Sequence, residues 1–225
     1  MADINSHKRV NEPILGFLER PALQWLAARM PAWVTPDVLT GIGVAGAALI
    51  FASYWASQVY PWFLWVASVG FLINWFGDSL DGTLARFRKI ERPKYGFYID
   101  HTMDVIAEAF VFLGLGMSPF MRFDVAAMIY IGYLMMSVLV YIRTAVEGVF
   151  KITYSGFGPT ELRVVAVALN AFMFFSGTGA MIEAFGSEFS YYDVAGVMIA
   201  ATLIGAFLAQ TFAHAKLLAN IDKKD

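Results

Sequence analysis

Six long apolar segments constrain the fold of this chain more than any other feature of its sequence. They run over about 37–57, 61–86, 96–119, 122–149, 161–182 and 191–217. A helix needs ~20 mostly apolar residues to cross a bilayer, and only helices and closed barrels pair their backbone groups inside lipid. The sequence therefore predicts an all-α, polytopic membrane protein, a bundle of six transmembrane helices. The fifth segment has the weakest apolar pattern, because residues 176–179 interrupt it.

Composition supports a membrane protein and excludes several kinds of site. Hydrophobic residues make up 59% of the chain and charged residues 15%, against about 45–50% and about 25% in soluble domains. The net charge of −2 argues against a nucleic-acid partner, which selects a basic surface. The chain has no cysteine, which excludes disulfides, thiol nucleophiles and zinc–thiolate centres.

The residues before the first apolar segment have a different pattern. Over 12–31, apolar residues such as Leu18 and Leu23 recur among charged ones, and the stretch is too charged to span a bilayer. We expect an amphipathic helix that lies on the membrane surface and bends near Pro21. An amphipathic leader without that role fits the same residues.

Basic residues predict how the chain is oriented. With both termini in the cytoplasm, fifteen of the sixteen Lys and Arg residues lie on the inner side and only Arg122 on the outer side, as the positive-inside rule requires. The prediction is a multi-pass integral membrane protein with both termini cytoplasmic. It has an N-terminal segment with a juxtamembrane helix (1–35), a six-helix transmembrane domain (36–217) and a cytoplasmic tail (218–225).

Four aspartates mark the polar ends of the second and third apolar segments. Asp78 and Asp81 are three residues apart, and Asp100 and Asp104 are four apart, so each pair lies on one face of a helix. Because a short basic connection makes the two helices antiparallel neighbours, we expect the pairs to face each other at the cytoplasmic side. A carboxylate at bilayer depth is unfavourable by roughly 2.5–3.5 kcal/mol, so such residues are rare and usually functional.

The aspartates have the chemistry of a cation site. Four carboxylates in one pocket repel one another unless cations neutralise them or some are protonated. Oxygen ligands without imidazole or thiolate favour Mg²⁺, Mn²⁺ or Ca²⁺ over zinc. Pairs of such ions about 3.5–4 Å apart are common in phosphoryl chemistry.

Small and basic residues beside the aspartates fit a phosphorylated ligand. Gly82 lets a ligand approach the backbone, Ala85 is small, and Arg86 offers the fork geometry that suits phosphate. Gly96 opens the third apolar segment, where we expect crowding. The basic residues from Arg88 to Lys94 need no such role, because a solvated loop facing lipid phosphates explains them.

These residues together form one long motif. It reads Asp78-x-x-Asp81-Gly82-x-x-Ala85-Arg86, then Gly96-x-x-x-Asp100-x-x-x-Asp104. The motif resembles the signature of the CDP-alcohol phosphotransferase (CDP-alcohol phosphatidyltransferase) family of integral membrane enzymes. The nine residues between Arg86 and Gly96 exceed the family's usual spacer. Ahead of the first apolar segment, Pro36-Asp37-x-x-Thr40 is similar to a family element that has Asn where this chain has Asp37.

The resemblance implies an activity and a site. The four aspartates would hold two divalent cations, Mg²⁺ or Mn²⁺, with Asp100 and Asp104 catalytic and Asp104 a ligand or the general base. The CDP moiety would be received by Pro36, Asp37, Thr40, Gly82, Ala85, Arg86 and Gly96. The enzyme would transfer a substituted phosphate group from a CDP-linked donor, first of all CDP-diacylglycerol, to the hydroxyl of an acceptor alcohol, releasing CMP in phospholipid synthesis. The resemblance also implies that the protein forms a homodimer and that membrane lipids surround it.

Three further residues are candidates to bind the acceptor or to assist the base, and a fourth, Glu108, has two readings of its own. The Asp-His-x-x-Asp run around His101 resembles members that use CDP-choline or CDP-ethanolamine with a lipid alcohol, where His assists deprotonation; a packing histidine fits equally. Glu108 lies one turn beyond Asp104 and is either a fifth polar group of the pocket or a hydrogen bonder within the bundle. Arg143 and Arg163 are candidates to bind the acceptor; salt bridges with acidic neighbours at the helix ends, such as Glu147 and Glu161, fit them equally.

Two other classes of protein also place carboxylates in a membrane. A cation or proton transporter with an acidic relay explains the aspartates but not Gly82, Ala85 and Arg86 at fixed spacing. An intramembrane aspartyl protease needs two catalytic aspartates rather than four on adjacent helices.

Overall fold

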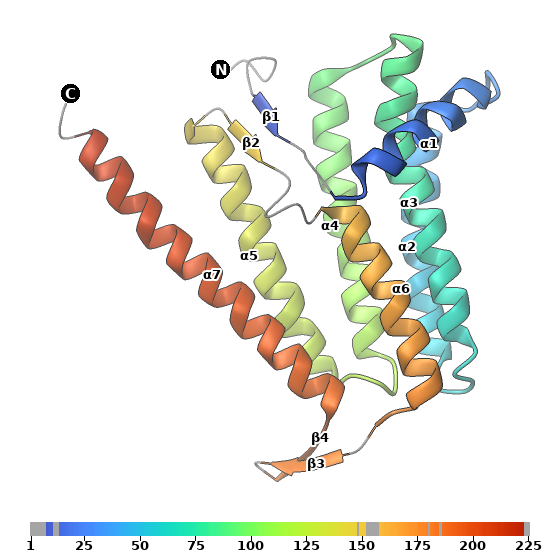
Figure 1. Cartoon of the computed structure of the whole chain (residues 1–225), viewed down its shortest axis with the longest axis vertical. Coiled ribbons are helices and arrows are strands. Elements are labelled where there is room, and N and C mark those ends of the chain that lie inside the picture. The colour runs from blue at the N-terminus through green and yellow to red at the C-terminus, as the bar shows by residue number, and fades with distance from the viewer. Residues whose placement is uncertain are drawn as a thin grey trace.

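The computed structural model describes residues 8–10, 14–147, 149–151, 158–179, 181–184 and 186–222. Most of the predicted N-terminal segment before residue 14, and residues 223–225 of the predicted tail, lie outside the described residues. The part that is described is dominated by helices (Figure 1). The helices are α1 Gly16–Arg29, α2 Pro36–Ala56, α3 Phe63–Arg88, α4 Pro93–Gly116, α5 Phe123–Glu147, α6 Pro159–Ser176 and α7 Tyr191–Ile221.

The all-α prediction is confirmed, and a helix lies over each of the six predicted apolar segments. Four helices are long and apolar enough to cross a membrane, namely α2, α3, α5 as far as Val146, and α7. The helix α4 instead carries Asp100, Asp104 and Glu108, and α6 has only 18 residues. The helix α1 continues through Pro21, so the bend predicted there does not end the helix.

Glycines bring α2 and α3 into close contact. A Cβ atom on Gly77 of α3 would lie 2.3 Å from the backbone nitrogen of Gly43, and one on Gly46 of α2 would lie 2.6 Å from the nitrogen of Asn74. Such small residues let helix backbones approach within a membrane bundle. On its other side α2 packs on α4, where a Cβ on Gly114 would meet Phe51 at 2.7 Å.

The helix α2 therefore lies against both α3 and α4. We had expected α3 and α4 to be direct neighbours, but each packs more extensively on α2 than on the other. The remaining helices pack on this three-helix group at two places. The helix α5 packs on α4 and α7 packs on α5, while α6 packs on α3. In Figure 1, α1 crosses the end of the bundle where α3 connects to α4.

Two short strand pairs depart from the sequence prediction. Strand β1 (Lys8–Val10) pairs in parallel with β2 (Val149–Lys151), and the sequence pattern predicted neither strand. Strands β3 (Met181–Ala184) and β4 (Ser187–Ser190) form an antiparallel hairpin between α6 and α7. The fifth predicted segment, 161–182, is therefore too long: α6 ends at Ser176, and Gly177 adopts a positive φ of 71° that suits glycine.

A buried network of hydrogen bonds connects α6 to α2 and α3. The Tyr54 hydroxyl donates to Asn170 Oδ1 at 2.8 Å, and Asn170 Nδ2 donates to Ser68 Oγ at 3.2 Å. Tyr54 and Asn170 are both almost fully buried. Because unpaired polar groups are costly among apolar side chains, these bonds favour one alignment of the three helices.

Candidate active site

A polar pocket lies between α2, α3 and α4. The space between their side chains, counted together with the adjoining open solvent, is about 230 Å³. The residues that line it are Thr40, Gly43, Val44, Asn74, Asp78, Asp100, Met103, Asp104 and Ala107. Three of the four predicted aspartates therefore share one pocket, and α2 supplies the wall that joins the two carboxylate pairs.

The fourth aspartate, Asp81, is held at the side of α2. Thr40 Oγ1 donates to Asp81 Oδ2 at 2.6 Å, and the backbone N–H of Gly82 lies 2.5 Å from Asp81 Oδ1. Asp81 is buried. This hydrogen bond joins two residues that were predicted from separate motifs. Because Thr40 also lines the pocket, the bond connects Asp81 to the pocket.

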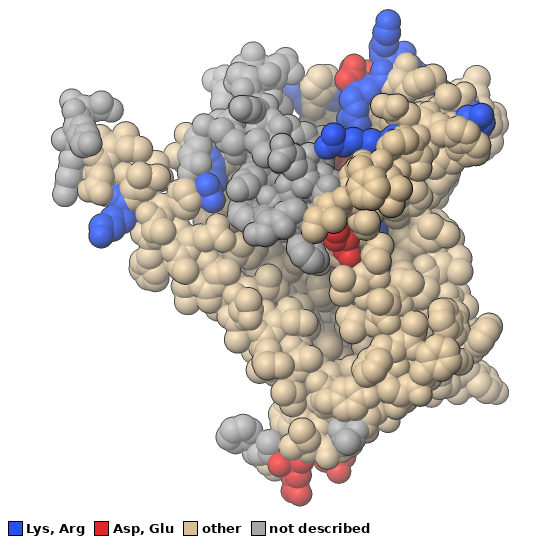
Figure 2. Space-filling model, in the orientation of Figure 1, with Lys and Arg blue, Asp and Glu red and all other residues tan. Residues whose placement is uncertain are grey.

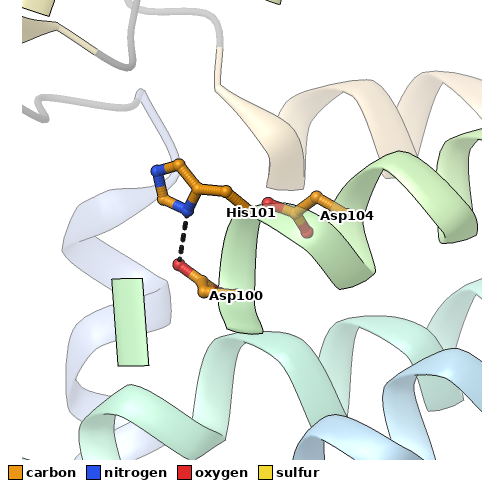
Figure 3. Close-up of side chains that lie close together, drawn as sticks. All are labelled: Asp100, His101 and Asp104. Atoms are coloured by element: carbon orange, nitrogen blue, oxygen red, sulfur yellow. Dashed lines mark ion pairs between the residues drawn. The ribbon is translucent and has the colours of Figure 1, made fainter. Parts of the chain in front are cut away.

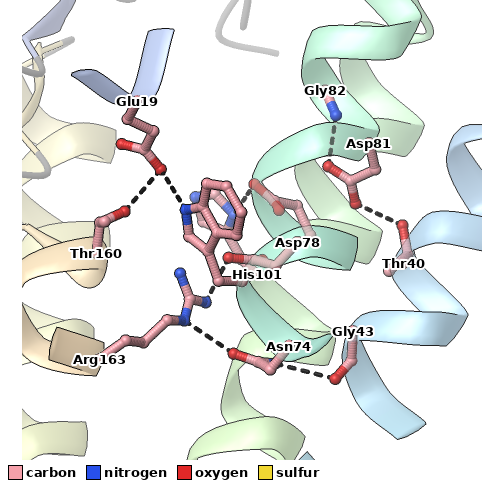
Figure 4. Close-up of polar contacts among 12 residues, drawn as sticks. Glu19, Thr40, Gly43, Asn74, Asp78, Asp81, Gly82, His101, Thr160 and Arg163 are labelled. Atoms are coloured by element: carbon pink, nitrogen blue, oxygen red, sulfur yellow. Dashed lines mark hydrogen bonds and ion pairs between the residues drawn. The ribbon is translucent and has the colours of Figure 1, made fainter. Parts of the chain in front are cut away.

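Asp78 is paired with an arginine from α6 (Figure 4). Arg163 Nη2 donates to Asp78 Oδ2 at 2.5 Å, and Arg163 Nε donates to Asn74 Oδ1 at 2.9 Å. Asn74 in turn donates through Nδ2 to the carbonyl of Gly43 at 3.0 Å. Asn74 was missed from the sequence, since an asparagine one turn before Asp78 carries no signal without knowledge of its neighbours.

The α4 side of the pocket holds a compact group of three ligand-bearing side chains (Figure 3). One ligand atom each from Asp100, His101 and Asp104 lies within 4.8 Å of the others. His101 Nδ1 approaches Asp100 Oδ2 at 3.3 Å. The His101 ring lies 4.1 Å from that of Phe97 and 5.4 Å from that of Tyr141, measured between centroids. His101 is thus both packed among aromatic rings and next to the carboxylates.

The residues predicted to receive the nucleotide lie at the same end of α2 and α3. Gly82 faces Arg86: a Cβ at Gly82 would come within 3.3 Å of Arg86 Nη1. The Arg86 side chain is exposed, and its Nη2 donates to Thr83 Oγ1 at 3.2 Å. Gly96 is exposed, and a Cβ atom there would meet no atom of the described residues within 4 Å, so these residues do not supply the crowding expected at Gly96.

The predicted helix start on α2 is well formed. Pro36 occupies the first turn of α2, and Thr35 Oγ1 accepts a hydrogen bond from the Val38 N–H at 3.3 Å, the usual capping arrangement. Asp37 forms an exposed ion pair with Arg92, the residue before α4. Arg92 therefore contacts the protein rather than standing in a purely solvated loop.

Two of the other basic residues lie in different places. Arg143 lies between α5 and α7, where its Nη1 is 3.5 Å from Gln210 Oε1, and it is not among the residues that line the pocket. Arg88, predicted as part of a solvated loop, instead donates to backbone carbonyls between α1 and α2, including Pro31 at 2.8 Å and Met30 at 3.0 Å. These partners of Arg88 could not be predicted from the sequence, because every residue has a backbone carbonyl that could accept a hydrogen bond.

The donor set of the pocket fits hard divalent cations. It consists of carboxylate oxygens, a threonine hydroxyl and an amide, and such oxygen ligands suit Mg²⁺ or Mn²⁺. His101 lies beside the carboxylates of Asp100 and Asp104. Asp100 and Asp104 lie on one side and Asp78 on the other, while Arg163 supplies positive charge to Asp78. Carboxylates this close repel one another, so a bound cation would lower the energy of the arrangement.

Comparison with known proteins gives the family of the chain. The model of the CDP-alcohol phosphatidyltransferase family matches residues 33–208. The chain belongs to this family. Among its relatives, cholinephosphotransferase 1 of Danio rerio is 24% identical over 211 residues, which are 87% of this chain and 52% of the relative.

Two prokaryotic relatives of the family match shorter regions. Phosphatidylinositol phosphate synthase of Cutibacterium acnes is 38% identical over 95 residues, 40% of this chain and 41% of the relative. Archaetidylinositol phosphate synthase of Pyrococcus horikoshii is 32% identical over 104 residues, 46% of this chain and 52% of the relative. The chain thus spans about half the length of the curated relatives it matches. By name, one of these three relatives is a phosphotransferase and the other two are synthases of phosphorylated lipids. None of them supports the transporter alternative.

Proposed function

We propose that this chain transfers a substituted phosphate group from a CDP-linked donor to the hydroxyl of an acceptor alcohol, with release of CMP and in the presence of Mg²⁺ or Mn²⁺. One observation carries the proposal. Side chains from both halves of the aspartate motif, Asp78 on α3 and Asp100 and Asp104 on α4, line a single pocket with Thr40 of α2. Membership of the family supports the same reaction class.

Each motif residue has a proposed task. We propose that Asp78, Asp81, Asp100 and Asp104 hold two divalent cations, which when bound would neutralise the diphosphate and the charge that develops on the leaving CMP. Arg86 would bind a donor phosphate, since its guanidinium is exposed beside Gly82. The donor's cytidine side would be received by Pro36, Asp37, Thr40, Gly82, Ala85 and Gly96.

The transfer needs one base and no covalent enzyme intermediate. A carboxylate, Asp104 or Asp100, takes the proton of the acceptor hydroxyl as its oxygen attacks the phosphorus that bears the non-cytidine group. The bond from that phosphorus to the oxygen of CMP breaks, and CMP leaves. General base catalysis of this kind contributes about 10²–10⁴-fold. His101 is placed to assist, because its ring lies next to Asp100.

The donor defines two candidate versions of the reaction. In the first, a phosphatidyl group moves from CDP-diacylglycerol to a soluble alcohol. In the second, a phospho-alcohol moves from a CDP-choline or CDP-ethanolamine type of donor to a lipid alcohol. The second is favoured by the match to cholinephosphotransferase over 87% of this chain and by the grouping of His101 with Asp100 and Asp104.

We propose that the acceptor approaches from the side of α5 and α6. Arg163 supports this, because its guanidinium contacts Asp78 and Asn74, which line the pocket. Its Nη1 is buried without a hydrogen-bond acceptor among the described residues. Arg143 lies further out, between α5 and α7, and would contact a larger acceptor.

We further propose that all six helices α2–α7 span the bilayer, with both termini and the pocket on the cytoplasmic side. Figure 2 supports the orientation, because Lys and Arg gather at the end that holds α1 and the α3–α4 connection, and acidic residues at the end of the hairpin. Trp62, Trp65 and Phe174 cluster at the hairpin end, as aromatic residues do at a membrane interface.

We propose the same division of the chain into segments that the sequence analysis predicted. Residues 1–35 would lie along the membrane surface through α1, whose Phe17 is 71% exposed; residues 36–217 would form the catalytic domain, and 218–225 a cytoplasmic tail. The resemblance to the family is also the ground for proposing a homodimer.

The test is CMP release by the purified chain. CDP-diacylglycerol, CDP-choline and CDP-ethanolamine would each be supplied with Mg²⁺ or Mn²⁺ and with soluble or lipid alcohols. We expect CMP from one class of donor, lost on addition of EDTA and reduced at least ~10²-fold by Asp104→Asn. The matched control is Asp124→Asn, an exposed aspartate at the start of α5, which should keep the full rate. Absence of CMP with every donor would refute the proposal.

A further inference from the structure

One carboxylate of α1 contacts both helices that hold the Asp78–Arg163 pair. Glu19 Oε1 accepts a hydrogen bond from the indole N–H of Trp75 on α3 at 2.8 Å and one from the hydroxyl of Thr160 on α6 at 2.7 Å (Figure 4). Glu19 is partly buried, as are both of its partners. A single oxygen atom thus joins three helices that are far apart in sequence.

The two partners of Glu19 are close in sequence to the site. Trp75 follows Asn74 directly and precedes Asp78 by three residues, while Thr160 precedes Arg163 by three. Residues three apart on a helix lie on neighbouring positions of the same face. The hydrogen bonds of Glu19 therefore fix α3 and α6 within one turn of the atoms through which Arg163 contacts Asp78 and Asn74.

A second contact fastens the start of α1 to the start of α6. The backbone N–H of Leu15 donates to Glu161 Oε1 at 2.7 Å, and Glu161 Oε2 accepts from the N–H of Gly158 at 2.9 Å. Glu161 is buried. The first turn of α6, which directly precedes Arg163, is thus contacted by α1 at two neighbouring residues, Thr160 and Glu161.

The helix α1 lies outside the residues 33–208 that match the family model. Its contacts with α3 and α6 are therefore a feature of this chain that the family assignment does not cover. A helix whose only role was to anchor the chain to the membrane would need its exposed apolar face, but not a carboxylate turned inward between α3 and α6.

We propose that Glu19 is a positioning residue: through Trp75 and Thr160 it sets the spacing of α3 and α6 that lets Arg163 contact Asp78 and Asn74, and so makes α1 part of the catalytic unit. This inference rests on the proposed function for its kinetic consequence. A displacement of about 1 Å at a catalytic site lowers the rate by as much as ~10²-fold.

Three variants separate positioning from anchoring. Glu19→Gln keeps an oxygen that accepts from both donors, Glu19→Ala removes it, and Glu188→Ala removes an exposed glutamate of β4 at the other end of the bundle. We expect Glu19→Ala to lower the rate of CMP release about 10-fold or more, Glu19→Gln to stay within about threefold of the parent, and Glu188→Ala to match it. The same loss in Glu19→Gln as in Glu19→Ala would contradict the role given to the shared acceptor oxygen.

A double-mutant cycle shows whether Glu19 acts through Arg163. In an Arg163→Gln background the contact to be positioned is already altered, so we expect Glu19→Ala to cause little further loss. Losses that multiply independently would mean that Glu19 and Arg163 contribute separately, which would overturn the inference.

A distance measurement decides the inference without catalysis. Because the chain has no cysteine, Leu72→Cys on α3 and Val164→Cys on α6, both exposed side chains, introduce the only two sites for spin labels. We expect Glu19→Ala to shift or broaden the distance between the labels, and Glu19→Gln and Glu188→Ala to leave it unchanged. An unchanged distance in Glu19→Ala would refute the positioning role even if the parent releases CMP, whereas a parent that releases no CMP would refute the proposed function alone.

Discussion

Substitution of Gly77 by alanine gives the sharpest test of how α2 and α3 form the site. A Cβ at this position would lie 2.3 Å from Gly43 N and 2.4 Å from Leu39 O, both backbone atoms of α2. Ordinary contact begins near 3.4 Å, and backbone atoms in a helix cannot rotate away, so α2 and α3 must separate by about 1 Å. The Thr40–Asp81 hydrogen bond, 2.6 Å long, would then lengthen to about 3.6 Å, beyond the range of a hydrogen bond.

The expected effects of Gly77→Ala follow from this separation. Overpacking of a helix contact costs about 1–3 kcal/mol of stability, and a shift of about 1 Å in the site lowers the rate of CMP release by as much as ~10²-fold. Rate and thermal unfolding would be measured on the same detergent-purified sample. Gly41→Ala is the control on the neighbouring helix α2. Apart from the local backbone of α2, no atom of the described residues lies within 4 Å of its Cβ position, and alanine should stabilise the helix by up to ~1 kcal/mol at unchanged rate. A Gly77→Ala enzyme with the parental rate would refute the reasoning.

Two further predictions concern the buried network and the acceptor. Tyr54→Phe leaves Asn170 Oδ1 buried without its donor, so we expect a loss of about 1–3 kcal/mol in unfolding free energy, with CMP release per folded molecule unchanged. The control Tyr60→Phe, at an exposed tyrosine, should change neither stability nor CMP release. Equal melting temperatures for Tyr54→Phe and the parent would contradict the prediction. Arg163→Ala removes a partly buried guanidinium that contacts Asp78 and Asn74 of the pocket lining, so the apparent KM for the acceptor should rise roughly 10-fold or more. The same loss of rate at every acceptor concentration, with KM unchanged, would contradict a contact between Arg163 and the acceptor.

Much of the site was accessible from the sequence because its residues follow helical spacing. Asp78, Asp100 and Asp104 were predicted to share a pocket, and they do. Thr40 came from a separate motif, yet its hydroxyl binds Asp81. The helices were equally predictable, since each long apolar segment has few ways to pair its backbone groups in lipid.

The partners supplied by other helices were not predictable. The contact of Arg163 with Asp78 joins residues 85 positions apart, and neither side chain signals the other. Likewise Glu19 is an ordinary charge of an amphipathic stretch until α3 and α6 bring Trp75 and Thr160 to it. Long-range pairs depend on which helices pack together, and the sequence pattern indicated the faces of helices but not their neighbours.

The placement of α2 between α3 and α4 also escaped prediction. A short connection indicates that two helices are antiparallel, but it does not exclude a third helix from the space that they share. The glycines at 43, 46 and 77 carried the signal, because backbone contact of α2 with α3 at these positions is closer than larger residues allow. They fit ordinary helix packing as well, so they could not be assigned to one pair of helices in advance.

The length and position of α7 have a consequence for the lipid around the protein. Its 31 residues extend about 46 Å at 1.5 Å per residue, well beyond a hydrocarbon layer of about 30 Å, and in Figure 1 it leans away from the other helices. It packs mainly on α5, so it can change its tilt while α2, α3 and α4 keep their contacts. Membranes of different thickness would then be accommodated at the edge of the bundle, and the geometry around the aspartates would stay the same.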